Sequence, residues 1–172
     1  RDYLRRDITQ RRAGSIVGEW FIKPAQVTKQ FTGFVFHTMT DPETLEETER
    51  FAYEEFLALP PDTLVWASEP VVWVSEFRYY VIGSEVKGWA RYDCGPDEAP
   101  EPDLNLVQEM AQKMALSCGA PAAFTLDVGV LASGETALIE CNDAWAIGYY
   151  KGSLSQHDYM HMLWVRWAQI AK

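Results

Sequence analysis

The amino-acid sequence predicts an α+β protein in which antiparallel sheets are flanked by helices. Segments rich in Val, Trp and Tyr alternate with helix-like segments, but without the strict strand–helix–strand order that a parallel sheet requires. Late in the chain, two runs that alternate apolar and polar residues flank Ser133 and Gly134, a pattern typical of an antiparallel hairpin. A chain of 172 residues, 48% of them hydrophobic, is long enough for one domain or for two small lobes that share a cleft.

The beginning of the chain predicts a helix and then a strand. Residues 1–13 carry many charges and few apolar side chains, so we expect a solvated helix that ends near Gly14. Residues 18–24 (GEWFIKP) predict a short strand that Pro24 stops, because proline has no N–H to donate to a sheet.

A loop, a strand and a helix are expected next. Residues 25–33 are typical of a loop and residues 34–38 (FVFHT) of a strand. Residues 42–59 place acids around apolar side chains, which favours an amphipathic helix with an acidic first turn. Pro60 and Pro61 end this helix.

The second half of the chain predicts more strands and two further helices. Two β-rich segments cover residues 63–81 and 86–92 with a turn between them, and an acidic, proline-rich loop follows over residues 96–102. Apolar periodicity predicts a helix over residues 104–118 and a last helix, dense in aromatic side chains, over residues 156–171.

The composition narrows the possible partners. The chain has 25 acidic and 15 basic residues, so its net charge of −10 disfavours nucleic acid and anionic membrane surfaces. A small anion such as ATP remains possible as a ligand, because local lysines, arginines and Mg²⁺ can make the electrostatic potential of a cleft positive. No apolar run reaches the roughly 18 residues of a membrane span. Three widely spaced cysteines, without metal-ligand spacing, indicate reduced thiols and a cytoplasmic protein.

Oxygen-donating side chains gather on the predicted hairpin, whose strands cover residues 124–131 and 136–141. Asp127 lies on the first strand, and Glu140 and Asn142 end the second. Alternation places Glu140 and Asn142 on one face, and pairing across the hairpin brings Asp127 near it. Carboxylate and amide oxygens suit a hard ion such as Mg²⁺. The alternative is a pair of surface acids on an edge hairpin.

Cations accompany the predicted strands of the chain. Lys23 ends a strand, Lys29 lies in the loop that follows, and Arg78 and Arg91 lie within later strands. Lysine binds phosphate as a point charge, whereas arginine offers a two-pronged fork. The alternatives are a salt bridge from Arg78 to Glu76 and an ordinary exposed loop lysine at Lys29.

A short extended segment, Ser68-Glu69-Pro70-Val71, interrupts the long β-rich stretch. Backbone N–H and C=O groups of such a segment can meet the edge of a flat heterocycle, with Glu69 as acceptor for an exocyclic amine. An ordinary kinked connection fits this segment equally well.

Several of these stretches together carry a family resemblance: FIKP, TKQFTG, WASEPV, SEFRYYV, GWARYD, TLDVGV, and LIECN followed by GYYKG. Over about residues 18–155 the chain resembles the ATP-grasp superfamily, and within it the clade named for one arginine and two lysines. The resemblance implies an ATP-grasp fold with a small lobe (18–67), a hinge (68–71), a large lobe (72–172) and Mg-ATP between the lobes. The chain begins inside the family's usual layout, so the resemblance also implies a preceding N-terminal domain that this chain does not include.

The resemblance also implies an activity. The chain would be an ADP-forming ligase that passes the γ-phosphate of ATP to a small-molecule or peptide carboxylate. An amine or similar acceptor would then attack the acyl phosphate and form an amide or peptide bond.

Residue roles follow from the resemblance by position, with ATP and Mg²⁺ as cofactors. Lys23 resembles the strand lysine on the α- and β-phosphates, and Lys29 the second lysine, near the flexible loop. Arg78 would contact the γ-phosphate or the acyl phosphate, so that Arg78 and Lys23 are the catalytic candidates. The remaining roles are adenine binding by Ser68, Glu69 and Val71, and metal binding by Asp127, Glu140 and Asn142. Independently of the family, Arg91 and Lys151 are candidates for the substrate's carboxylate or phosphate.

The chain departs from the common ATP-grasp pattern in two places. Thr125 stands where many ATP-grasp ligases have an arginine two residues before the first metal-binding acid, and we expect Arg78 to supply that charge. The phosphate loop contains only one glycine, Gly33.

Two other functions compete with a ligase. One is an ATP-binding domain without turnover, and the other is a protein-interaction domain that uses Trp145, Tyr149 and Tyr150. The sequence does not predict an oligomeric state.

Overall fold

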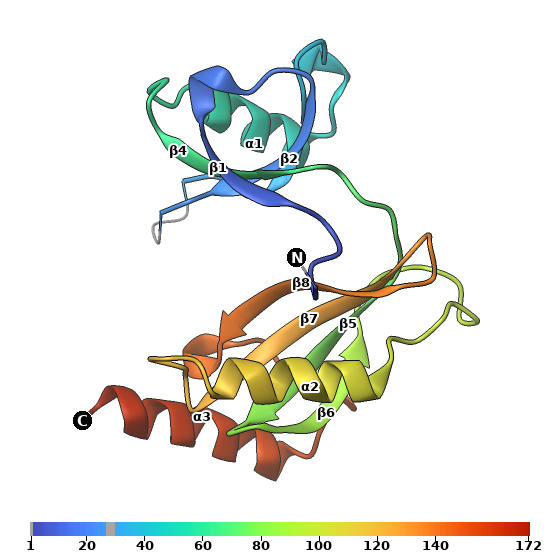
Figure 1. The fold of residues 1–172 in the computed structure, drawn as a ribbon, viewed down its shortest axis with the longest axis vertical. Helices are drawn as coiled ribbons and strands as arrows, with labels where there is room; N and C mark the ends of the chain where they lie inside the picture. Colours follow the sequence, from blue (N-terminus) through green and yellow to red (C-terminus); the bar gives the residue numbers. More distant parts are fainter. Residues whose placement is uncertain (1, 27–29) are drawn as a thin grey trace. The chain divides into compact units, whose positions relative to one another are not determined.

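The computed structural model describes residues 2–26 and 30–172, and the chain divides into two compact units (Figure 1). The first unit is Arg6–Val71, and the second comprises Val72–Lys172 together with Asp2–Arg5. Both units combine an antiparallel sheet with helices, which confirms the predicted α+β class. Within the described ranges, no helix is both long and apolar enough to traverse a lipid bilayer.

The first unit is a four-stranded antiparallel sheet in the order β1-β4-β2-β3, with helix α1 on one face. Its elements are β1 (Ile8–Arg12), β2 (Glu19–Pro24), β3 (Phe34–His37), α1 (Glu47–Leu57) and β4 (Leu64–Ser68). Ile22, Val65 and Phe36 on the sheet pack with Tyr53 and Phe56 of α1. The predicted strands over residues 18–24 and 34–38 are confirmed.

Two predictions in the first unit are wrong. The helix predicted over residues 1–13 is not formed by the described residues 2–13, because residues 8–12 pair with β4 as strand β1, with Arg11 opposite Val65. The positive charge of Arg11 has a partner on a strand further along the sheet, since its guanidinium carbon lies 3.8 Å from the centre of the Trp20 ring on β2. The helix predicted over residues 42–59 begins only at Glu47, because Asp41 caps a separate 3₁₀ turn over Pro42–Thr44.

The second unit is a four-stranded antiparallel sheet in the order β6-β5-β7-β8. Its elements are β5 (Trp73–Ile82), β6 (Glu85–Arg91), α2 (Leu104–Ala115), β7 (Ala123–Leu131), β8 (Thr136–Asp143) and α3 (Gln156–Ile170). The predicted hairpin and both predicted helices are therefore present. Helix α2 packs on one face through Val107 and Met110, and α3 packs on the other through Met162. All 9 residues of β7 are buried between these layers.

Candidate functional site

The hairpin of β7 and β8 brings the three predicted oxygen donors together. Asp127 and Glu140 are direct cross-strand partners, and Asn142 follows two residues later on the same face of β8. The Asn142 side-chain amide donates to Glu140 Oε1 at 2.8 Å and to Asp127 Oδ2 at 3.3 Å. The pairing shifts by one residue immediately after Asp127, which leaves Ile139 as the extra residue of β8. The three side chains converge on the face of the sheet opposite α2.

This donor set fits a hard divalent cation. The carboxylates of Asp127 and Glu140 supply oxygen ligands, and Asn142 supplies a third when its amide, whose Nδ2 here donates to both carboxylates, turns its oxygen toward them. Mg²⁺ commonly keeps further positions for phosphate and water. Across residues 2–26 and 30–172, no cluster of three or more His, Cys, Asp or Glu side chains has an arrangement that could hold a metal. A metal at this place therefore depends on Asn142 as the third donor.

The electrostatics of the carboxylates support the same interpretation. Burial raises the pKa of Asp127, the Arg78 fork opposes that rise, and the neighbouring Glu140 adds to it. Two carboxylates this close repel each other when both are ionised. A dication would relieve this repulsion.

Arg78 holds Asp127 through a two-pronged ion pair. Arg78 Nε donates to Asp127 Oδ1 at 2.8 Å and Nη2 donates to Oδ2 at 2.6 Å. The pair is largely desolvated, with 15% of the arginine side chain and 3% of the aspartate side chain exposed. The carboxylate partner of this fork is Asp127 and not Glu76, because direct cross-strand neighbours lie closer than residues two apart on one strand.

Aromatic side chains and a second acid border the Arg78 guanidinium. Its central carbon lies 5.4 Å from the ring centre of Tyr150 and 5.9 Å from that of Tyr92. The two rings are nearly parallel at 9°, and Tyr92 donates its hydroxyl to Glu76 Oε2 at 3.0 Å. Burial raises the pKa of Glu76, and the Tyr92 hydrogen bond opposes the rise.

Sequence reasoning did not include Tyr92 in the site and treated Tyr150 as an exposed aromatic, although it is half-buried. The only signal was the spacing of Glu76 and Arg78, which puts both on one face of β5.

Thr125 occupies the position where an arginine was expected from the family pattern. It lies on β7 opposite both Tyr80 and Asn142, on the same face as Asp127. Its side chain is fully buried, and its hydroxyl has no hydrogen-bond partner among the residues that the structure describes. The positive charge on this face comes instead from the neighbouring strand, through Arg78.

The lysine predicted for the first unit, Lys23, lies on the sheet face that does not pack against α1. Lys23 follows the buried Ile22 on β2, so its side chain lies on the face opposite α1, with Trp66 as cross-strand partner. Gly33 lies close to this strand, since a β-carbon there would be 3.2 Å from the Cβ of Lys23. Lys29 lies outside the described residues.

The remaining candidates differ in their surroundings. Ser68 is buried and its hydroxyl donates to the Glu69 carbonyl at 3.1 Å, whereas the Glu69 side chain is exposed and Val71 is half-buried. Arg91 is engaged, because its Nε and Nη2 donate to Asp93 at 2.8 Å and 2.7 Å and its Nη1 to the Pro96 carbonyl at 2.6 Å. Lys151 is exposed.

Comparison with known proteins identifies relatives of this architecture. Residues 3–162 match the family model of the ATP-grasp domain, family 2 of the clade named for one arginine and two lysines. No protein with a curated description matches the chain.

Solved structures with the same fold are distant in sequence. The ATP-grasp ligase PsnB, in complex with a minimal precursor, Mg and ADP, aligns at a TM-score of 0.56 and 19% identity, over 99% of this chain and 54% of that one. D-Alanine–D-alanine ligase from Bacillus anthracis aligns at a TM-score of 0.56 and 11% identity, over 98% of this chain and 63% of that one. A RimK domain protein from Sphaerobacter thermophilus aligns at a TM-score of 0.54 and 12% identity, over 85% and 54% of the two chains. This chain therefore spans little more than half the length of these proteins.

Proposed function

The chain belongs to family 2 of the arginine-and-two-lysines clade of ATP-grasp domains, and from this membership we propose that it binds Mg-ATP and activates a carboxylate for ligation. The observation that carries the proposal is the set of Arg78, Asp127, Glu140 and Asn142 on one face of the second sheet, in which the Arg78–Asp127 pair is largely desolvated. PsnB and D-alanine–D-alanine ligase are ligases by their names, which supports the same reaction class for this chain.

Asp127, Glu140 and Asn142 would hold Mg²⁺, which when bound offsets the negative charge of the triphosphate. Arg78 then exchanges one anionic partner for another, because its fork fits carboxylate and phosphoryl oxygens alike. It leaves Asp127 and contacts the transferring phosphoryl group, where Lys23 and Lys29 offset further charge. Adenine binding falls to Ser68, Glu69 and the Val71 backbone. Lys151 is a freer contact for the substrate carboxylate than Arg91, whose donors serve Asp93 and Pro96.

The reaction needs no general base in its first step. A substrate carboxylate oxygen attacks the γ-phosphorus, the bond to the β-phosphate oxygen breaks, and ADP leaves. An amine then attacks the acyl carbon, orthophosphate leaves, and the amine gives up a proton as the amide bond forms. Arg78 and the lysines act by neutralising the charge that develops on the phosphoryl oxygens.

Calorimetric titration with ATP and Mg²⁺ tests the metal assignment. We expect Glu140→Ala to weaken Mg²⁺-dependent ATP binding by about tenfold or more, since even outer-shell changes at metal sites cost that much. Glu135→Ala is the matched control, because it removes the same charge from the exposed turn of the same hairpin. Equal binding by wild type and Glu140→Ala would show that the metal assignment is wrong.

A product assay tests the ligase reaction itself. With ATP, Mg²⁺ and pooled amino acids and dipeptides, we expect release of ADP and phosphate that depends on the pool. Release of AMP would contradict an acyl-phosphate intermediate. Binding of Mg-ATP without any ADP release would instead favour the nucleotide-binding module without turnover.

A further inference from the structure

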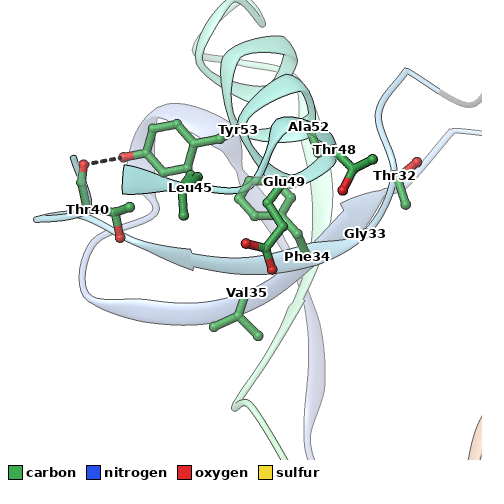
Figure 2. Close-up of a pocket in the computed structure, with 10 residues that line it drawn as sticks. All are labelled: Thr32, Gly33, Phe34, Val35, Thr40, Leu45, Thr48, Glu49, Ala52 and Tyr53. Atoms are coloured by element: carbon green, nitrogen blue, oxygen red, sulfur yellow. Dashed lines mark hydrogen bonds between the residues drawn. The ribbon is translucent and has the colours of Figure 1, made fainter. Parts of the chain in front are cut away.

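A groove in the first unit includes Thr32 and Gly33, beside the expected phosphate loop, but its other lining residues have no role in the proposed ligase reaction. It has a volume of about 280 Å³ and lies between β3 and helix α1 with the segment that leads into it (Figure 2). Val35 lies on the β3 side, and Leu45, Glu49, Ala52 and Tyr53 lie on the side of the helix. Pockets for small organic ligands usually measure about 300–1,000 Å³, so this one suits one or two side chains better than a whole metabolite.

One wall of the groove is an unpaired sheet edge. Among the strands of the described ranges, β3 pairs only with β2, so its other side is free. The Thr38 N–H donates to the Gly18 carbonyl at 3.1 Å, which makes that cross-strand pair a hydrogen-bonded one. Because hydrogen-bonded pairs alternate along an antiparallel ladder, the backbone groups of Val35 and His37 point away from β2.

The two outward residues differ in what they leave available. The His37 carbonyl already accepts from the Thr40 N–H at 3.0 Å. No hydrogen bond from any described residue reaches the outward N–H and C=O of Val35, and half of this residue's surface is exposed. An extended peptide needs such a pair of backbone groups to add as a strand.

The other wall combines apolar side chains with an acid. Ala52 and Tyr53 are buried and Leu45 is half-buried, which forms an apolar floor. The Glu49 side chain reaches from α1 toward β3, and no described residue forms a salt bridge with it (Figure 2). Acids surround it along the segment: Glu43, Glu46, Glu47, Glu54 and Glu55. The one cation of the helix, Arg50, lies 3.7 Å from Glu43. The groove therefore favours a positively charged occupant.

We propose that this groove binds an extended basic peptide segment of another protein, which adds as a strand to the edge of β3. The peptide backbone pairs with Val35, and an apolar side chain packs over Ala52 and Tyr53. A lysine or arginine two residues away pairs with Glu49, since side chains two apart on a strand share a face. This site lies within the first unit and does not depend on the ligase proposal.

An array of acetylated seven-residue peptides tests the proposal. Four alternate positions carry threonine, and the three positions between them carry every combination of the twenty amino acids. The wild-type chain should enrich peptides with a lysine or arginine next to an apolar residue among the varied positions. On a selected peptide, the Val35 amide should become protected from hydrogen exchange. No enrichment, or enrichment of acidic peptides, would overturn the proposal.

Two variants and one control sharpen the test. Val35→Pro removes an outward N–H and none of the hydrogen bonds to β2, and it should weaken binding of the selected peptide. Glu49→Lys should weaken binding of the selected peptide by about fivefold or more, and it should shift the preference on the array toward acidic peptides. Glu54→Lys makes the same charge change at an exposed position outside the groove and should have little effect. Equal losses of peptide affinity in Glu49→Lys and Glu54→Lys would show that the peptide is attracted only by the general charge of the helix, which would overturn the proposed site. Protection of Val35 that rises with protein concentration in the absence of peptide would assign the edge to a second copy of the chain and likewise overturn it.

Discussion

The two units differ in the side chains that their sheets bury. In the first unit, aromatic rings carry the packing: Phe36 stacks on Tyr53 with ring centres 5.4 Å apart, and meets Phe56 edge-on at 5.1 Å. In the second unit, an ionised side chain stands in the middle of the most buried strand. Asp127 has apolar neighbours on both sides in β7, and its charge is compensated by Arg78 from β5.

The difference indicates where function constrains the second unit. A buried carboxylate is costly unless it is paired, and an apolar residue in its place would often leave the fold as stable or more stable. In the first unit, the core between the sheet and α1 consists of aromatic and aliphatic side chains. We infer that Asp127 is retained for what its oxygens bind and not for the stability of the sheet.

The largest expected effect comes from removing the partner of that carboxylate. Arg78→Met should destabilise the second unit by about 3–5 kcal/mol, because it leaves Asp127 buried and unpaired. Hydrogen exchange of the β7 amides measures the loss within this unit, and the β2 amides report on the first unit in the same sample.

An exposed ion pair in the first unit provides the control. Arg12 Nη1 lies 2.6 Å from Asp62 Oδ1, but the side chains are 69% and 83% exposed. Arg12→Met should therefore cost less than about 1 kcal/mol. If the two arginine variants lose similar stability, then water reaches Asp127 freely and the contrast between the units is not one of desolvation.

Part of the candidate site could be predicted from local sequence. The turn at Ser133 and Gly134 fixes which strands pair, and the two-residue period of a strand places Glu140 and Asn142 on one face of β8. The bulge at Ile139 is not visible in this pattern, yet it brings Asp127 onto that face, because a regular register would pair Asp127 with Ile139.

Pairings between distant segments could not be predicted in this way. Arg78 and Asp127 are 49 positions apart, and the register of β5 on β7 includes an irregularity that no local pattern reveals. The prediction for residues 8–12 failed for the same reason, since these charged residues form strand β1 only through pairing with β4. The side-chain partner of a cation is decided by tertiary register, whereas its position on a strand is decided by sequence.

A smaller effect should come from Asp93, a charged group of the second unit that is held by hydrogen bonds. Its carboxylate accepts from the Glu76 and Gly95 backbone amides, both at 2.7 Å, and from the Arg91 fork. The Arg91 fork is the main cause that holds the pKa of Asp93 well below its usual range, and the two amides add to it. Asp93→Asn should cost about 1–2 kcal/mol at pH 7, as expected for charge-assisted hydrogen bonds.

The pH dependence of that loss has a definite sign. A carboxyl whose pKa is lowered by folding stabilises the protein above its unfolded value of about 3.9, and this stabilisation is lost as the pH falls through the lower folded value. The difference in free energy of unfolding between wild type and Asp93→Asn should therefore be largest at pH 7 and should shrink below about pH 3.9. Asp62→Asn in the first unit, at an exposed pair, should show little gap at either pH. Urea titrations at pH 7 and pH 3 measure both, and a gap for Asp93→Asn that stays constant with pH would refute the assigned cause.

The smallest effect concerns how the helices of the two units begin. Helices α2 and α3 start with side-chain caps, since Asp103 accepts from the Asn105 N–H at 2.9 Å and Ser155 accepts from the Asp158 N–H at 3.0 Å. Helix α1 has Glu46 at this position, without a cap hydrogen bond. Glu46→Ser should therefore stabilise the first unit by about 0.5–1 kcal/mol, because serine can accept from the free amides of the first turn. Hydrogen exchange of the α1 amides measures the gain, with Glu47→Ser as a control one residue inside the helix.

If Glu46→Ser brings no gain in stability, the start of α1 is already fixed by the 3₁₀ turn before it and by the aromatic rings that pack against it. The ring-packed unit would then owe even its helix boundary to packing.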